Sequence, residues 1–118
     1  KNQLGNCGNI TIIDTYLPNI QEFYQMADVY FFPVAEQGNC IDVPLSCLEA
    51  AACGTPVVTT KYGEMGAFVG KPGFYFLEDM EPKTMNDVIA QASQDKSGAS
   101  RSSVLPYDWS NAISQLLR

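Results

Sequence analysis

Short apolar runs alternate with amphipathic stretches along most of the chain. Strands buried on both faces of a parallel sheet appear as continuous apolar runs, and we predict such strands over residues 29–32, 56–60 and 74–77. Residues 9–14 contain three isoleucines, and their β-branched character predicts a further strand. Alternation of strands with helices predicts an α/β fold, a Rossmann-like, mostly parallel sheet with flanking helices.

Helical periodicity occupies the segments between these strands. Apolar residues spaced as on one helix face predict helices over residues 18–27 and 84–94. A third helix is predicted to begin at Asp42, which serves as its N-cap, and to end near residue 52. Gly54 follows as the left-handed residue that ends many helices, and a last helix is predicted to begin at Asp108.

The length of 118 residues indicates one domain, residues 1–118, with 46% hydrophobic residues to form its core. Residues 95–103 are rich in serine, glycine and lysine, and we interpret them as a mobile linker.

The net charge of −6 argues against binding nucleic acid, which favours basic surfaces, and against docking on anionic lipid. No apolar run approaches the roughly 20 residues of a membrane-spanning helix. The four cysteines form no C-x-x-C pair and the chain has no histidine, so we predict no metal site. Free cysteines are typical of a reducing compartment, and we expect a cytoplasmic protein.

The segment over residues 36–60 carries the strongest chemical signal. Glu49 lies in the middle of a predicted helix whose other residues are mostly small or apolar. A charged side chain is costly to bury unless a partner pairs with it. A glycine-containing loop leads directly into the N-terminus of this helix. In α/β proteins, a ligand held by such a loop lies beside the helix N-terminus, and this arrangement is a common anion site.

Several motifs in this region resemble the donor-binding lobe of GT-B retaining glycosyltransferases, glycosyltransferase family 4 or group 1. The central match is Leu-Glu-Ala at residues 48–50, followed by Cys-Gly-Thr-Pro-Val-Val at residues 53–58. It extends to Pro-Leu-Ser at 44–46, Ala-Asp-Val-Tyr-Phe-Phe-Pro at 27–33 and Tyr-Asp-Trp-Ser at 107–110. The resemblance covers about residues 10–118 and implies part of the C-terminal lobe of such an enzyme.

The resemblance implies that a nucleotide-diphosphate sugar binds here as substrate, with no other cofactor and no metal. Glu49 would accept hydrogen bonds from the ribose hydroxyls, since a carboxylate offers two acceptors to a vicinal diol. Leu45 and Ser46 would contact the diphosphate and ribose through their backbone. The preceding loop would approach the sugar and diphosphate through Glu36, Gly38, Asn39 and Cys40.

One position departs from the family pattern. The family's first glutamate falls at Ile41, so Glu36 and Asp42 are the remaining candidates for a catalytic acid. Glu36 can equally be a solvated loop residue, and Asp42 can act only as a helix cap. Glu49 has its own alternative, a partly exposed residue on a half-buried helix.

The resemblance therefore predicts transfer of a hexose with retained configuration, by a parent enzyme whose acceptor lobe lies elsewhere in the same chain. We expect these 118 residues alone to be inactive. The alternative functions are a non-catalytic nucleotide-sugar-binding module and an interaction module that forms a homo-oligomer through an exposed sheet edge. Any membrane association, peripheral in the parent protein, would come from other parts.

Overall fold

The structure is a computed structural model that describes residues 8–34, 45–61 and 63–107. Three strands, β1 (Tyr30–Phe32), β2 (Val57–Thr60) and β3 (Phe74–Leu77), form a parallel sheet in the order β1-β2-β3. The α/β prediction is thus confirmed, with a small parallel sheet. The other elements are α2 (Ile20–Met26), α3 (Leu45–Ala52), η2 (Gly63–Phe68), α4 (Pro82–Ser93), α5 (Ser100–Val104) and η3 (Leu105–Tyr107).

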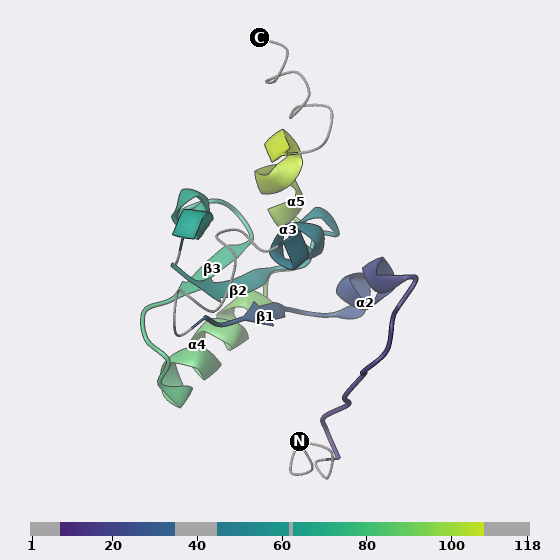
Figure 1. The fold of residues 1–118 in the computed structure, drawn as a ribbon. Coiled ribbons are helices and arrows are strands. Elements are labelled where there is room, and N and C mark those ends of the chain that lie inside the picture. Colours follow the sequence, from purple (N-terminus) through teal and green to yellow (C-terminus); the bar gives the residue numbers. More distant parts are fainter. Residues whose placement is uncertain (1–7, 35–44, 62, 108–118) are drawn as a thin grey trace.

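Helices cover both faces of the sheet (Figure 1). The helices α3 and α5 pack together on one face, and α4 packs against β2 and β3 on the other. Neighbouring residues of a strand point to opposite faces. Accordingly, Val57 belongs to the core cluster under α3, whereas Val58 belongs to the cluster under α4.

The connection from α3 to β2 is formed as the sequence predicts. Gly54 has a φ of 83°, and its N–H donates to the carbonyl of Ala51 at 2.9 Å, which ends α3. Val57 then begins β2 and is fully buried, as expected of a central strand. The chain therefore reverses in a few residues and returns directly beneath the helix.

The predicted strand over residues 9–14 is wrong, because this segment forms no strand. Its three isoleucines, Ile10, Ile12 and Ile13, are 40–47% exposed. A strand needs a neighbour to satisfy its backbone groups, and β-propensity mostly reflects packing on a half-buried surface. Within the described residues β1 pairs only with β2, so no sheet edge receives this segment.

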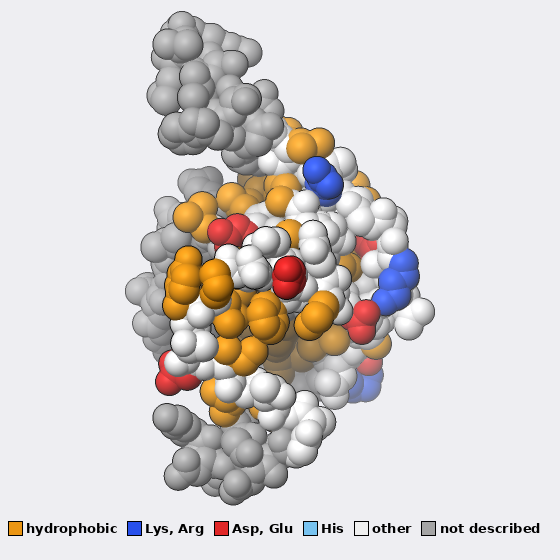
Figure 2. All heavy atoms as spheres, turned by 90° about the vertical axis from the view of Figure 1, so that its right-hand side faces the viewer, with side chains coloured by type: hydrophobic (Ala, Val, Ile, Leu, Met, Phe, Trp, Pro, Cys, Tyr) orange, Lys and Arg blue, Asp and Glu red, His pale blue; other side chains and the backbone are white. Residues whose placement is uncertain are grey.

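The α2 side of the molecule is only partly covered. Tyr24 is the buried residue of α2, whereas Ile20, Phe23 and Met26 are exposed. Phe31 of β1 is 38% exposed, so the prediction that this strand is buried on both faces is wrong. Figure 2 looks onto this side and shows hydrophobic side chains gathered between polar ones.

The segment predicted as a linker contains a packed helix in its second half. Ser100, the first residue of α5, is 1% exposed and bonds to the backbone beside α3. Serine-rich composition had indicated a loop, but small hydroxyl side chains also suit a tight helix contact. The predicted cap at Asp42 and the helix from Asp108 lie outside the described residues. Among the described helices, none is long and apolar enough to span a membrane.

Candidate functional site

A cavity of about 420 Å³ opens at the carboxyl ends of the three strands. Open α/β sheets bind ligands beyond this edge. Each strand contributes to the lining, since Val34 follows β1, Thr60 ends β2 and Leu77 ends β3. Lys61, Glu78, Asp79 and Met80 complete it. We call it the strand-end cavity.

Two threonines fix the wall between β1 and β2. The Thr59 hydroxyl donates to the carbonyl of Phe32 at 2.7 Å. The Thr60 hydroxyl donates to the Val34 carbonyl at 3.0 Å and accepts from the Val34 N–H at 3.2 Å. Pro33 has no N–H to donate to the sheet ladder, so the side chain of Thr60 continues the link past it.

Charged side chains that directly follow β2 and β3 line the strand-end cavity. Lys61 brings one ammonium group, and Glu78 and Asp79 bring two carboxylates. The backbone N–H of Glu81 donates to Asp79 Oδ1 at 2.9 Å, and this bond, helped by Thr84, lowers the pKa of the Asp79 carboxyl below its usual value. Asp79 is therefore a fixed, ionised acceptor at the start of α4.

Glu49 is exposed on α3, so its charge remains solvated and does not need a partner to offset a cost of burial. It nevertheless has a partner, since the Tyr24 hydroxyl donates to Glu49 Oε1 at 3.2 Å. Burial of Tyr24 and the nearby Glu49 charge raise the pKa of this phenol to about 12, so it stays a donor at neutral pH. The hydrogen bond orients the carboxylate and leaves further acceptor sites open to solvent.

The first turn of α3 contains the other predicted contacts that the structure describes. Leu45 is 68% exposed. Ser46 is half-buried, and its hydroxyl oxygen accepts a hydrogen bond from the Tyr30 hydroxyl at 2.7 Å. Leu45, Ser46 and Glu49 are thus brought together on one short helix, and two tyrosines from α2 and β1 support them.

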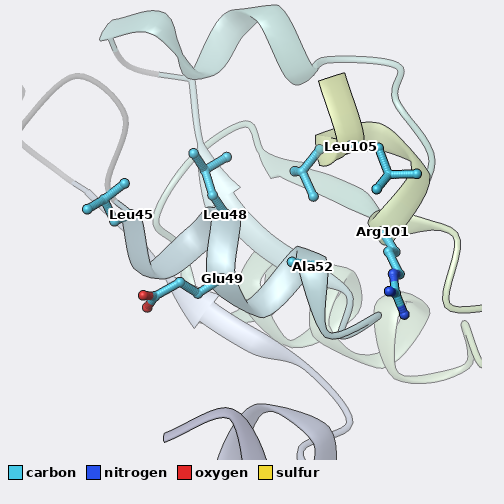
Figure 3. Close-up of a pocket in the computed structure, with 7 residues that line it drawn as sticks. Leu45, Leu48, Glu49, Ala52, Arg101 and Leu105 are labelled. Atoms are coloured by element: carbon cyan, nitrogen blue, oxygen red, sulfur yellow. The ribbon is translucent and has the colours of Figure 1, made fainter. Parts of the chain in front are cut away.

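A second hollow, of about 330 Å³, lies between α3 and α5 and is mainly apolar (Figure 3). Leu48 and Ala52 line it from α3, and Leu105 lies opposite. Glu49 and Arg101 stand at its two ends with their charged groups pointing apart. Glu49 belongs to this hollow and not to the lining of the strand-end cavity.

The remaining predicted site residues lie outside the described part of the chain; these are Glu36, Gly38, Asn39, Cys40 and Asp42. Cys47 is buried in the core under α3, and Cys53 is half-buried at the end of the same helix. The residues that the structure describes include no group of three or more acids, cysteines or histidines able to hold a metal ion.

Sequence reasoning missed three side chains that matter here. Tyr24 was expected only as part of an apolar helix stripe, yet its hydroxyl holds Glu49. Glu78 and Asp79 received no role, although an acidic pair placed directly after an apolar strand indicates the ligand edge of a parallel sheet. A polar residue directly after a predicted parallel strand is therefore a candidate ligand-site residue even when it belongs to no motif.

Comparison with known proteins agrees with the motifs. The family model Glycosyl transferases group 1 matches residues 1–95. A D-inositol 3-phosphate glycosyltransferase from Corynebacterium urealyticum is 34% identical over 102 residues, and the match covers 80% of this chain and 23% of that protein. The chain thus spans under a quarter of this relative's length, and no solved structure matches it. The chain belongs to the group 1 family of glycosyl transferases.

Proposed function

We propose that the chain is the donor-binding part of a retaining hexosyltransferase with a GT-B fold, which takes its hexose from a nucleotide-diphosphate sugar. The observation that carries this proposal is Glu49, an exposed carboxylate on α3 held by the Tyr24 hydroxyl. Membership of the glycosyl transferase family supports a transferase parent. The similarity to a D-inositol 3-phosphate glycosyltransferase supports the same proposal.

The geometry of α3 suits the ribose and diphosphate of a donor. A carboxylate with one oxygen held by Tyr24 can still accept hydrogen bonds from both hydroxyls of a vicinal diol. The N–H groups in the first turn of a helix have no partner within the helix, and those of Leu45 and Ser46 lie in this position. The helix dipole adds a partial positive charge there, which favours a diphosphate.

Two carboxyl groups preceding α3 remain the candidates for the catalytic acid. In this proposal Glu36 and Asp42 lie on the segment that leads into α3, with Gly38, Asn39 and Cys40 between them. No metal is required, because the helix N-terminus and backbone N–H groups offset the charge of the leaving diphosphate.

We also infer that the acceptor lobe of the same parent chain completes the active site, so that these 118 residues alone transfer no sugar. The exposed apolar side chains of α2, seen in Figure 2, and the unpaired edge of β1 among the described strands support a covering partner. A second copy of the chain is the alternative cover. We place the parent enzyme in the cytoplasm, at most peripherally bound to a membrane.

A second candidate function is a nucleotide-sugar-binding module without transfer. It is favoured by Ile41, which stands where the family pattern has its first glutamate. Such a module would keep the Glu49 interaction with ribose and lack turnover. Comparing binding with turnover in the whole parent protein distinguishes the two functions.

Isothermal titration of the folded chain with UDP, GDP and ADP tests the donor site. We expect one nucleotide to bind, and Glu49→Ala to weaken it about tenfold or more, because a hydrogen bond to a charged group contributes roughly 1.5–3 kcal/mol. The matched control is Asp87→Ala, which removes an exposed acid from α4 on the opposite face of the sheet. The same titration is repeated on the whole parent protein.

The two proteins together decide the outcome. Loss of affinity in Glu49→Ala but not in Asp87→Ala supports the proposal. If the parent protein and its Glu49→Ala variant bind the nucleotide with equal affinity, Glu49 does not contribute to the donor site, and the proposal loses its main support. Absence of nucleotide binding by both the chain and the parent would overturn the transferase proposal itself.

A further inference from the structure

We propose that the strand-end cavity is a binding site for a neutral saccharide, separate from the nucleotide contacts on α3. Its volume of about 420 Å³ lies within the roughly 300–1,000 Å³ of small-molecule sites. It lies where the ends of all three parallel strands meet, which is the usual ligand edge of such a sheet.

The charges at the mouth of the cavity disfavour an anionic ligand. Lys61 contributes one positive charge, whereas Glu78 and Asp79 contribute two negative charges. A phosphate group here would face two carboxylates for a single ammonium group, and like charges repel. A sugar hydroxyl both donates and accepts hydrogen bonds, so a neutral polyol can use the acids and the lysine together.

The polar side chains divide into those that shape the cavity and those that remain available. Thr60 is engaged as both donor and acceptor by Val34, and Asp79 is held by the N–H of Glu81. The ion pairs among the described residues join Lys83 to Asp87 and Lys96 to Asp28. Lys61 and Glu78 take part in neither of these ion pairs, and both are exposed. Their charged groups can therefore contact a ligand in the cavity.

Apolar side chains provide the surface that a sugar also needs. Three apolar residues line the cavity, of which Leu77 is buried, Val34 is half-buried and Met80 is exposed. The C–H faces of a pyranose ring can pack on such groups while its hydroxyls reach the charged rim. A flexible thioether such as that of Met80 adapts its shape to different rings.

This proposal rests on the cavity alone and does not depend on the donor site. Glu49 does not line the strand-end cavity, and Glu78 does not line the hollow beside α3. Nucleotide binding that depends on Glu49 and saccharide binding that depends on Glu78 can therefore succeed or fail separately. The two titrations use the same folded chain and share the Asp87→Ala control.

The test is a titration of the isotopically labelled chain with glucose, mannose and myo-inositol, followed by amide NMR. We expect weak saturable binding with shifts concentrated at Lys61, Glu78 and Met80. Glu78→Ala and Lys61→Met should each lower the affinity about tenfold, the effect of losing one hydrogen bond to a charged group. Both side chains are exposed, so neither variant should unfold, and Asp87→Ala should bind like the original chain.

Three results would overturn the proposal. The first is a folded chain in which none of these polyols shifts the cavity amides. The second is unchanged affinity in both Glu78→Ala and Lys61→Met. The third is a titration in which inorganic phosphate shifts the same cavity amides and displaces the sugar. That result would show that the strand-end cavity is an anion site. Saturable shifts that both variants reduce would support the proposal.

Discussion

The two ends of the sheet are built in opposite ways. At the amino end, Ser100 is 1% exposed and its hydroxyl donates to the carbonyls of Ala51 and Thr55, at 3.0 and 3.1 Å. The Thr55 hydroxyl donates in turn to the Tyr24 carbonyl. At the carboxyl end, the strands open into a cavity with exposed Lys61 and Glu78 at its mouth.

This difference separates stability from ligand binding. Buried polar groups at the amino end are satisfied by one another, so removing one leaves another buried without a partner. Exposed side chains at the carboxyl end can be changed at little cost to the fold, because surface substitutions usually stay within about 0.5 kcal/mol. We therefore expect substitutions at the amino end to alter folding, and substitutions at the carboxyl end to alter binding.

The largest expected effect is that of Gly73→Ala at the amino end. Gly73 has a φ of 83°, and an added Cβ would lie 2.6 Å from Ser100 N and closer still to its Cα and Cβ. Left-handed strain of roughly 1–2 kcal/mol and overpacking of roughly 1–3 kcal/mol together predict a loss of about 2–5 kcal/mol in the free energy of unfolding. Urea unfolding followed by circular dichroism measures the loss.

Gly70→Ala is the matched control for this substitution. Gly70 has nearly the same φ, 84°, but no atom lies within 4 Å of an added Cβ. It should therefore lose only the left-handed strain, about 1–2 kcal/mol. Equal losses in the two variants would show that Ser100 does not pack against Gly73 closely enough to matter.

Ser100→Ala should have the second largest effect. It leaves the carbonyls of Ala51 and Thr55 without their common donor, at a cost of roughly 1–3 kcal/mol for a buried unsatisfied group. Ser102→Ala is the control, since this exposed serine of the same helix donates to the Ala99 carbonyl within its own turn. If thermal unfolding shows equal losses for the two serines, the amino end is not the stabilising region described above.

Much of this fold follows from local sequence patterns, and the part that does not is long-range. The apolar runs at β2 and β3 predicted strands that the structure contains, and Gly54 predicted the turn between α3 and β2. Residues 9–14 contain three β-branched isoleucines but form no strand, because pairing depends on a neighbour that local sequence does not specify. Helix α5 was not predicted for a related reason, since Ser100 is recognisable as a packed residue only when Gly73 and Thr55 lie beside it.

The candidate site was predictable where a motif exists. The motif around Glu49 led to α3, where Leu45, Ser46 and Glu49 lie together. Its partner Tyr24 is 25 residues away in sequence, and no pattern connects the two. The charged residues of the strand-end cavity come from the segments that follow β2 and β3, which are distant in sequence and meet only in the folded chain.

The smallest effect concerns Tyr24, which joins the packed amino end to Glu49. Its carbonyl accepts from Thr55 and its hydroxyl donates to Glu49, so Tyr24→Phe removes only the second contact. We expect a loss of about 0.5–1.5 kcal/mol at neutral pH, the net contribution of one hydrogen bond. Urea unfolding of the variant beside Tyr16→Phe, whose ring is 85% exposed, measures this loss.

The pH dependence of the same variant shows whether the phenol contributes as described. A group whose folded pKa is raised stabilises fully below its unfolded value, and the contribution is lost as pH rises toward the folded value. For Tyr24 this window runs from 10.0 to about 12. The stability difference between the original chain and Tyr24→Phe should therefore shrink across this window, while Tyr16→Phe follows the original chain. A difference that stays constant with pH would mean that the Tyr24 hydroxyl is not buried against Glu49, and that the carboxylate is oriented by some other contact.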